Sequence, residues 1–227
     1  MISVKNVSKS FQHLSLSQKT VILQNVDLSI PKGSWISIVG PSGSGKSTLL
    51  NIISGLLKPD TGEIYYNDVD LYQLHNKAKS DFRRKTIGFV FQDFKLLPYY
   101  SVVDNVMLPL LYDRKKKELY DKAVTLLQSI GIKKELFSRL PEGLSGGEKQ
   151  RVAIARSLIA DPDVMVCDEP TGNLDRENRD RIIDLLGQLR EDGKTIILVT
   201  HDLDVADHGD KLYFLKDGSL TLGGVSV

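Results

Sequence analysis

The distribution of apolar and polar residues divides the chain into three regions. Up to about residue 75, short apolar runs lie between glycine and proline, a pattern that predicts β-strands such as Trp35–Val39 and Glu63–Tyr66. From about residue 76 to residue 160 the chain is more charged, and apolar side chains recur at helical spacing. Beyond residue 160, strand-like and helix-like segments alternate again.

The clearest helix of the middle region has its apolar residues on one face. These residues are Leu119, Ala123, Leu126, Leu127 and Ile130. Gly131 follows at the position where a residue in left-handed conformation ends many helices. We expect residues from about 91 to 160 to form a helical subdomain inserted into the rest of the fold.

The last region contains two continuous apolar runs, Val164–Cys167 and Thr195–Val199, which are typical of strands buried on both faces. Between them a helical stripe is formed by Ile182, Leu185, Leu186 and Leu189. Strand, helix and strand in this order predict a parallel sheet with helices on both faces. We therefore expect residues 1–227 to form one α/β domain, with the core made by residues 1–90 and 161–227.

Composition and charge narrow the class of protein without giving a function. The 227 residues carry 30 Lys and Arg against 29 Asp and Glu, so attraction to nucleic acid by bulk charge is not expected. The single cysteine, Cys167, cannot form an intrachain disulfide and suggests a reducing compartment. The start of the chain does not resemble a signal peptide, and no apolar window is long enough to cross a bilayer.

A glycine-rich segment follows the predicted strand Trp35–Val39 and fits the pattern G-x-x-x-x-G-K-[ST]. It consists of Gly40, Pro41, Ser42, Gly43, Ser44, Gly45, Lys46, Ser47 and Thr48. Glycines let backbone N–H groups approach phosphate oxygens, and the start of the following helix adds partial positive charge. Lys46 is expected to reach the β- and γ-phosphates, and the Ser47 hydroxyl to bind Mg²⁺.

A phosphate loop alone leaves a GTPase, a small-molecule kinase and an ATP-driven machine open. The guanine-reading pattern Asn-Lys-x-Asp is absent, because Asn76-Lys77 continues with Ala78-Lys79. This disfavours a GTPase. A free-standing kinase remains as an alternative, although no lid for a phosphate acceptor is evident.

Polar residues follow the predicted strands at one edge of the sheet, where ligands of parallel sheets collect. Asp168 and Glu169 come directly after Val164–Cys167, and we expect Asp168 to hold Mg²⁺ and Glu169 to orient or deprotonate water. His201 follows the next run and is a candidate for contact with the γ-phosphate. Gln92 follows the strand-like run Thr86–Phe91 and could complete the Mg²⁺ shell. The alternative for Asp168 and Glu169 is an ordinary surface loop.

The three other histidines, His13, His75 and His208, show no such placement and are expected on the surface.

A second anion site is predicted at Leu144–Glu148, which opens a helix running to about Ala160. Ser145 is a good N-cap, and Glu148 completes a capping box. Gly146 and Gly147 expose backbone N–H groups in the first turn, where glycine costs about 1 kcal/mol relative to alanine. The alternative is an ordinary capped helix.

Taken in order, these motifs resemble those of the ABC-type ATPases, the nucleotide-binding subunits of ABC transporters. The resemblance covers nearly the full 227 residues. It matches Gly40–Thr48 to the Walker A loop, Gln92 to the Q-loop, Leu144–Glu148 to the family signature, Val164–Glu169 to the Walker B strand with its catalytic glutamate, Gly172–Asp175 to the D-loop and His201 to the switch histidine.

The resemblance implies a P-loop NTPase core with a mainly parallel sheet, an N-terminal antiparallel β subdomain and a helical insertion. It implies ATP and Mg²⁺ as cofactors and ATP hydrolysis as the reaction, with Lys46, Gln92, Glu169 and His201 in the catalytic set. Phe11 would stack on adenine where the family usually has Tyr, and Asp175 would contribute to the nucleotide site. Two further departures are Glu148 in place of Gln and Cys167 in place of Ala.

The resemblance also implies partners and a location. Two subunits would pack head to tail as a homodimer, so that each signature helix meets the γ-phosphate bound by the other subunit. A separate membrane permease would dock near Gln92–Tyr100 and hold the subunit at the cytoplasmic face of the cell membrane. The apolar residues there could instead be partly packed in the core.

Several stretches resemble the group that drives lipoprotein release, macrolide export, peptide resistance and cell-division signalling. These are His13–Thr20, Phe94–Pro98, Asp104–Leu110 and Asp168–Asp175. The alternatives are an amino-acid importer, which more often has Ser-Ala-Leu-Asp at Gly172–Asp175, and a regulatory ATPase of the cell-division type.

Overall fold

The computed structural model describes residues 1–12 and 19–223. His13 and most of the loop His13–Thr20 lie outside the described residues. Within them the strands are β1 (Ile2–Gln12), β2 (Lys19–Ile30), β3 (Trp35–Val39), β4 (Thr61–Tyr66), β5 (Val69–Asp70), β6 (Ile87–Val90), β7 (Val164–Asp168), β8 (Thr195–Thr200), β9 (Lys211–Lys216) and β10 (Ser219–Leu222). The α-helices are α1 (Lys46–Ile53), α2 (Asn76–Thr86), α3 (Val102–Met107), α4 (Lys116–Ser129), α5 (Gly146–Leu158), α6 (Arg176–Glu191) and α7 (Leu203–Ala206). Short 3₁₀ turns occupy Leu108–Leu110, Lys134–Leu136 and Pro141–Gly143.

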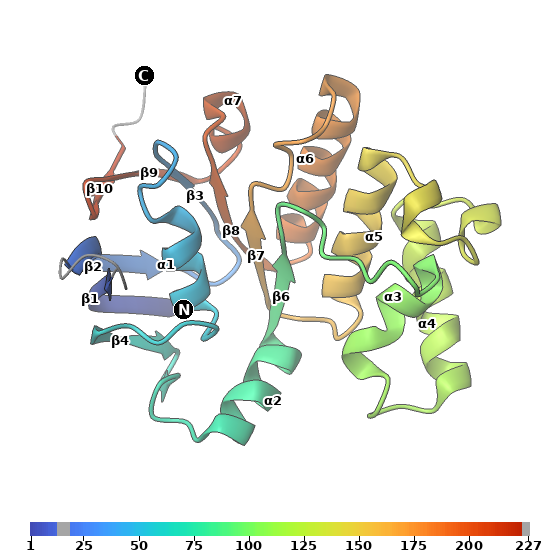
Figure 1. Ribbon diagram of the computed structural model, residues 1–227, viewed down its shortest axis with the longest axis horizontal. Helices are drawn as coiled ribbons and strands as arrows, with labels where there is room; N and C mark the ends of the chain where they lie inside the picture. Colours follow the sequence, from blue (N-terminus) through green and yellow to red (C-terminus); the bar gives the residue numbers. More distant parts are fainter. Residues whose placement is uncertain (13–18, 224–227) are drawn as a thin grey trace.

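Two sheets form the left and centre of the molecule in Figure 1. The first is antiparallel, in the order β2-β1-β4-β5. The second has the order β10-β9-β3-β8-β7-β6, and all its neighbours are parallel except β10 and β9. The predicted α/β fold, with a mainly parallel sheet and an N-terminal antiparallel β part, is confirmed.

The parallel sheet is buried on both faces, and its central strands β3, β7 and β8 are mainly apolar. On one face it packs with α1 and the antiparallel sheet around residues such as Leu49, Ile53 and Val199. On the other face it packs with α5 and α6 around residues such as Ile154 and Ile182. A third apolar cluster is formed by α3, α4 and α5 on the right of Figure 1. α5 contributes to the last two clusters and so joins the helices to the sheet.

The extent of α4 follows from its apolar face and from the glycine after it. Leu119, Ala123 and Leu127 of α4 are buried on one face, and Gly131 beyond it has a φ of 76°. This agrees with the predicted helix and its left-handed end.

Two predicted elements are slightly shorter in the structure. The run Thr86–Phe91 is a strand only over Ile87–Val90, because Thr86 ends α2 and Phe91 lies past β6. The helix predicted to run to about Ala160 ends at Leu158.

The histidines expected on the surface are exposed where the structure describes them. His75 caps α2 by accepting a hydrogen bond from the Ala78 N–H at 3.3 Å. His208 stacks on the buried indole of Trp35, with 6.4 Å between the ring centroids. Both therefore have structural contacts in addition to their exposure.

Candidate functional site

The glycine-rich loop joins β3 to α1 under tight steric limits. A Cβ on Gly40 would lie 2.2 Å from the Leu215 carbonyl oxygen, and Gly43 and Gly45 have φ values of 80° and 100°. All three positions therefore favour glycine. α1 begins without a side-chain cap and without an acidic residue in its first turn. Its free N–H groups and dipole consequently favour a bound anion.

Lys46 is the buried cation of this loop. Its Nζ donates to the carbonyl oxygens of Gly40 at 2.7 Å and Pro41 at 3.2 Å, and it lies 3.9 Å from Glu169 Oε1. The Ser44 hydroxyl is buried and has no hydrogen-bond partner among the described residues. A loop with three glycines, an unsatisfied hydroxyl and a buried ammonium fit the phosphates of a nucleotide.

Ser47 and Asp168 provide paired oxygen atoms beside Lys46. The Ser47 hydroxyl donates to Asp168 Oδ1 at 3.0 Å, across 121 residues of sequence. Within residues 1–12 and 19–223, no group of three His, Cys, Asp or Glu side chains could hold a metal ion. Two hard oxygen donors fit Mg²⁺, which is commonly bound by one or two protein groups together with water and phosphate oxygens.

Burial raises the pKa of the Asp168 carboxyl, and the neighbouring Glu169 adds to the effect, while the hydrogen bond from Ser47 opposes it. A carboxyl whose pKa is higher in the folded state opposes folding once it ionises. Stability is therefore lost as pH rises from the unfolded-state pKa through the folded-state pKa.

Replacing Asp168 with asparagine should raise the Tm of the nucleotide-free protein at pH 7, because the buried charge is removed. It should also abolish most of the stabilisation by Mg-ATP. At a ligand concentration of about 100 Kd this stabilisation is about 2.7 kcal/mol. Thermal unfolding with and without Mg-ATP measures both effects. A variant that keeps the full Mg-ATP shift would contradict the assignment of Asp168 to Mg²⁺.

Glu169 and His201 meet at the carboxyl ends of neighbouring strands. The Glu169 side chain is 9% exposed, and its Oε2 lies 3.0 Å from His201 Nδ1 and accepts from the His201 N–H at 3.4 Å. The backbone of Glu169 has a φ of 48°, and its N–H donates to the Val199 carbonyl at 3.0 Å. The surface-loop alternative for this pair is wrong, because Glu169 is buried and held from several sides. Such a carboxylate can orient or deprotonate a water molecule.

Gln92 lies at the same edge but outside this cluster. It is exposed, and the hydrogen bonds and ion pairs that join Lys46, Ser47, Asp168, Glu169 and His201 do not include it. Its assignment to Mg²⁺ and catalysis remains a prediction.

The segment after Gln92 is held by two side chains that sequence reasoning missed. Phe94 and Lys95 have positive φ values, and Arg156 of α5 donates to their carbonyl oxygens at 2.6 Å and 2.5 Å. Burial lowers the pKa of the Arg156 guanidinium. Asn105 of α3 is fully buried; it accepts from Leu97 N–H at 2.7 Å and donates to neighbouring carbonyl groups.

The apolar residues of Phe91–Tyr100 divide between surface and interior. Leu97, Tyr99 and Tyr100 are exposed, Tyr99 by 90%. Phe91 instead stacks on Phe89 with 4.3 Å between centroids, and Leu96 packs against the helical cluster. Both alternatives from the sequence therefore apply to part of this segment.

α5 begins with the predicted capping box. The Ser145 hydroxyl accepts from the Glu148 N–H at 3.3 Å, and the Ser145 N–H donates to Glu148 Oε2 at 2.8 Å. The carboxylate accepts from the Ser145 N–H and also from the Ser145 hydroxyl at 2.9 Å, and these two bonds lower the pKa of Glu148. Gly146 and Gly147 occupy the first turn. The Glu148 carboxylate is thus engaged by its own cap, and a role in binding a nucleotide remains a prediction.

Asn178 of α6 explains why Gly147 has no side chain. A Cβ on Gly147 would lie 2.2 Å from Asn178 Oδ1. Asn178 also donates twice to Asp175, the N-cap of α6, from its N–H at 2.9 Å and from Nδ2 at 2.8 Å. Asp175 is therefore hydrogen-bonded to a residue that packs against the first turn of α5, and its predicted contact with nucleotide stays a prediction.

Within one chain the two predicted anion sites do not form one pocket. α1 lies against the sheets on the left of Figure 1, whereas α5 belongs to the helical side on the right. Phe11 lies at the end of β1, is 44% exposed and has Lys9 Nζ 5.6 Å from its ring centroid. Its predicted stacking on adenine remains a prediction.

Comparisons with known proteins give one consistent family. A family model described as ABC transporter matches residues 23–172. The chain is 43% identical to the uncharacterized ABC transporter ATP-binding protein YvrO of Bacillus subtilis (strain 168), over 98% of this chain and 96% of YvrO. It is 42% identical to the uncharacterized ABC transporter ATP-binding protein MJ0796 of Methanocaldococcus jannaschii, over 97% of this chain and 95% of that protein.

Two solved structures are also similar. A dimeric post-hydrolysis state of the ATP-binding cassette MJ0796, bound to ADP and Pi, has a TM-score of 0.92 at 39% identity and covers 100% of both chains. The structure of cbiO1 from Clostridium perfringens, described as part of the ABC transporter complex cbiONQ, has a TM-score of 0.85 at 31% identity, over 98% of this chain and 87% of cbiO1. The fold is therefore that of an ABC ATPase cassette.

Proposed function

The chain belongs to the ABC transporter family as an ATP-binding subunit and ATPase, and from this premise we propose that two copies close over two ATP molecules to drive a separate membrane permease. The observation that carries the proposal is the division of the site. Lys46, Glu169 and His201 gather at the end of the parallel sheet, while the glycine-opened α5 lies away from them. A second copy supplies what one chain lacks. The MJ0796 cassette is a dimer, and cbiO1 is part of a transporter complex.

In this proposal water attacks the γ-phosphoryl group of ATP and ADP leaves, and Mg²⁺ would supply neutralisation of the phosphate charge. The loop Gly40–Thr48 holds the phosphates by backbone N–H groups and Lys46. Ser47 and Asp168 would hold the Mg²⁺. Glu169 accepts the proton of the attacking water, and His201 keeps the Glu169 carboxylate in position.

A mixing experiment tests the shared site. Lys46→Ala removes the cation of one anion site, and Gly146→Glu places a negative side chain in the other, at a position where a Cβ meets no atom closer than 3.6 Å. Each change is expected to lower ATP hydrolysis at least about 10²-fold. Mixed dimers of the two variants contain one intact site, so the mixture should regain activity well above either parent. Two Lys46→Ala preparations mixed together provide the control. A mixture no more active than its parents would exclude a shared site.

We further propose that the permease is of the type used for lipoprotein release, export or peptide resistance. Support comes from the stretches Phe94–Pro98 and Asp104–Leu110, in which Asn105 fixes the turn that carries exposed Tyr99 and Tyr100. The proposed docking surface is this segment from Gln92 to Tyr100. Within the described residues, no helix is long and apolar enough to cross a membrane.

An amino-acid importer subunit and a regulatory ATPase of the cell-division type are the alternatives. The rate of ATP hydrolysis with and without the copurified membrane partner separates a transport motor from a slow switch. Neighbouring open reading frames that encode a permease and a solute-binding protein would favour the importer.

A further inference from the structure

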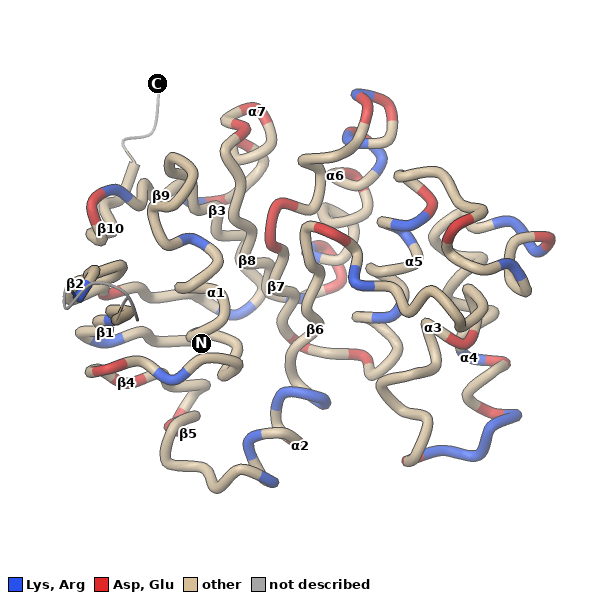
Figure 2. The backbone as a smooth tube through the Cα atoms, in the orientation of Figure 1, with Lys and Arg blue, Asp and Glu red and all other residues tan. Residues whose placement is uncertain are grey.

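Positive charge is concentrated on one edge of the molecule. The helix α2 carries five basic side chains against one acidic, and Arg114–Lys117 adds four basic residues in a row. Figure 2 shows both segments at the lower edge of the view. Because the whole chain has a net charge of only +1, the rest of it is net acidic. The net charge is therefore close to zero although positive and negative side chains are unevenly distributed over the surface.

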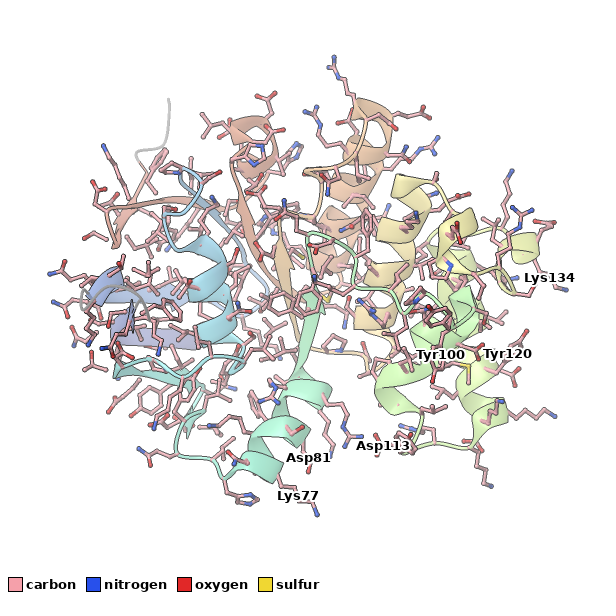
Figure 3. The ribbon with its side chains drawn as sticks, in the orientation of Figure 1. Lys77, Asp81, Tyr100, Asp113, Tyr120 and Lys134 are labelled. Carbon is pink, nitrogen blue, oxygen red and sulfur yellow. The ribbon has the colours of Figure 1, made fainter. Side chains whose placement is uncertain are left out.

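An ion-pair network joins these two segments, which we call the basic edge. Arg84 of α2 pairs with Asp81 at 3.0 Å and with Asp113, directly before Arg114. Asp81, Asp113 and Lys77 lie at the same lower side in Figure 3. The loop from Leu111 to Lys115 is thereby anchored to α2, and the basic side chains of both segments form one surface.

The loop also presents an aromatic ring to solvent. Tyr112 is 98% exposed, and each residue from Tyr112 to Glu118 is exposed. An amphipathic ring beside a run of lysines is the combination that binds at the headgroup level of anionic membranes.

The lysines have no evident role in the helix that they begin. Lys115 is the N-cap of α4, its side chain makes no capping hydrogen bond, and Lys116 and Lys117 are the first two helical residues. Positive charge at this end opposes the helix dipole and weakens the helix. Their charge therefore has a cost inside the chain, which an external anionic surface would offset.

We propose that the basic edge, centred on Tyr112 and Arg114–Lys117, binds anionic lipid headgroups at the surface of a bilayer. A lipid surface fits better than a protein partner, because lysine is depleted in protein interfaces and its hydrated ammonium suits diffuse attraction to many headgroups. The reason for a nearby bilayer rests on the proposed function. Arg84 also lines a cavity of about 250 Å³ with Phe89 and Phe91, beside the proposed docking segment.

Co-sedimentation of the purified chain with lipid vesicles, without nucleotide or permease, tests the proposal. We expect binding to phosphatidylcholine vesicles that contain phosphatidylglycerol and none to phosphatidylcholine alone. Each basic residue at such a surface contributes about fivefold, so Lys115→Gln/Lys116→Gln/Lys117→Gln should lower the partition coefficient about 10²-fold. Tyr112→Ser should weaken binding at all salt concentrations, whereas the lysine contribution should disappear at high salt.

The matched control is Lys133→Gln/Lys134→Gln/Lys216→Gln, which removes the same charge from exposed positions elsewhere. Lys134 lies on the right edge in Figure 3, away from Lys77 and Asp113. The control should bind like the wild type. Three results would overturn the proposal. They are the absence of wild-type binding to vesicles that contain phosphatidylglycerol, an equal loss of binding in both triple variants, and binding of the Lys115–Lys117 variant like that of the wild type. ATP hydrolysis is measured separately, so failure of the proposed function would leave the vesicle result unchanged.

Discussion

Replacing Glu169 with glutamine is expected to lower ATP hydrolysis by about 10³-fold, within the range for loss of a general base. Glutamine keeps the size of the side chain but cannot accept the proton of the attacking water. Because the phosphate loop and the Ser47–Asp168 pair are untouched, ATP binding should persist. ATP-bound dimers should therefore accumulate and be visible by size-exclusion chromatography at millimolar Mg-ATP.

The outcome separates a catalytic from a structural role for this carboxylate. Glu177→Gln on the exposed start of α6 is the matched control and should hydrolyse ATP at the wild-type rate. A Glu169→Gln protein that stays monomeric under these conditions would refute the shared-site dimer. A protein that still turns over ATP would show that another group activates the water.

The second large effect is expected for Gly40→Ala. The new Cβ would lie 2.2 Å from the Leu215 carbonyl oxygen and 2.8 Å from Ser44 Oγ. The backbone of β9 cannot yield as a flexible side chain would, so the loop or the sheet must shift. We expect a loss of about 3 kcal/mol in unfolding free energy, the upper part of the range for overpacking. For a domain of this size the Tm should fall by about 6–12 °C.

Gly43→Ala in the same loop provides the comparison. A Cβ there would meet no atom within 4 Å, and the φ of 80° is the only obstacle. Its cost should be about 1 kcal/mol, the conformational penalty alone. Unfolding and ATP binding of the two variants should therefore differ clearly. Equal effects would mean that conformation, and not contact with β9, explains why Gly40 is glycine.

The sequence predicts best those features that depend on buried, local patterns. The runs before Gly40, Asp168 and His201 are mainly apolar, and each forms a central strand of the parallel sheet. Because parallel strands end at a common edge, the meeting of Lys46, Glu169 and His201 follows from their positions in the chain.

Features that depend on surface or distant contacts were missed. The helix α2 has no buried residue, so its sequence has no apolar periodicity from which a helix could be predicted. Arg156 and Asn105 donate hydrogen bonds to carbonyl groups of the segment after Gln92. The bonds from Arg156 join residues about sixty positions apart in the sequence. Asn178 blocks the space above Gly147 across two helices. Neither the types of these residues nor their neighbours in the sequence predict these contacts.

The contact between Trp35 and His208 has a spectroscopic consequence. Trp35 is the only tryptophan of the chain and lies at the start of the strand that leads to Gly40. Its indole is buried and stacked against the exposed imidazole of His208 in the folded chain, and unfolding transfers it to water. The unfolding of each variant, including Gly40→Ala and Asp168→Asn, can therefore be followed by the intrinsic fluorescence of one residue, without an attached label.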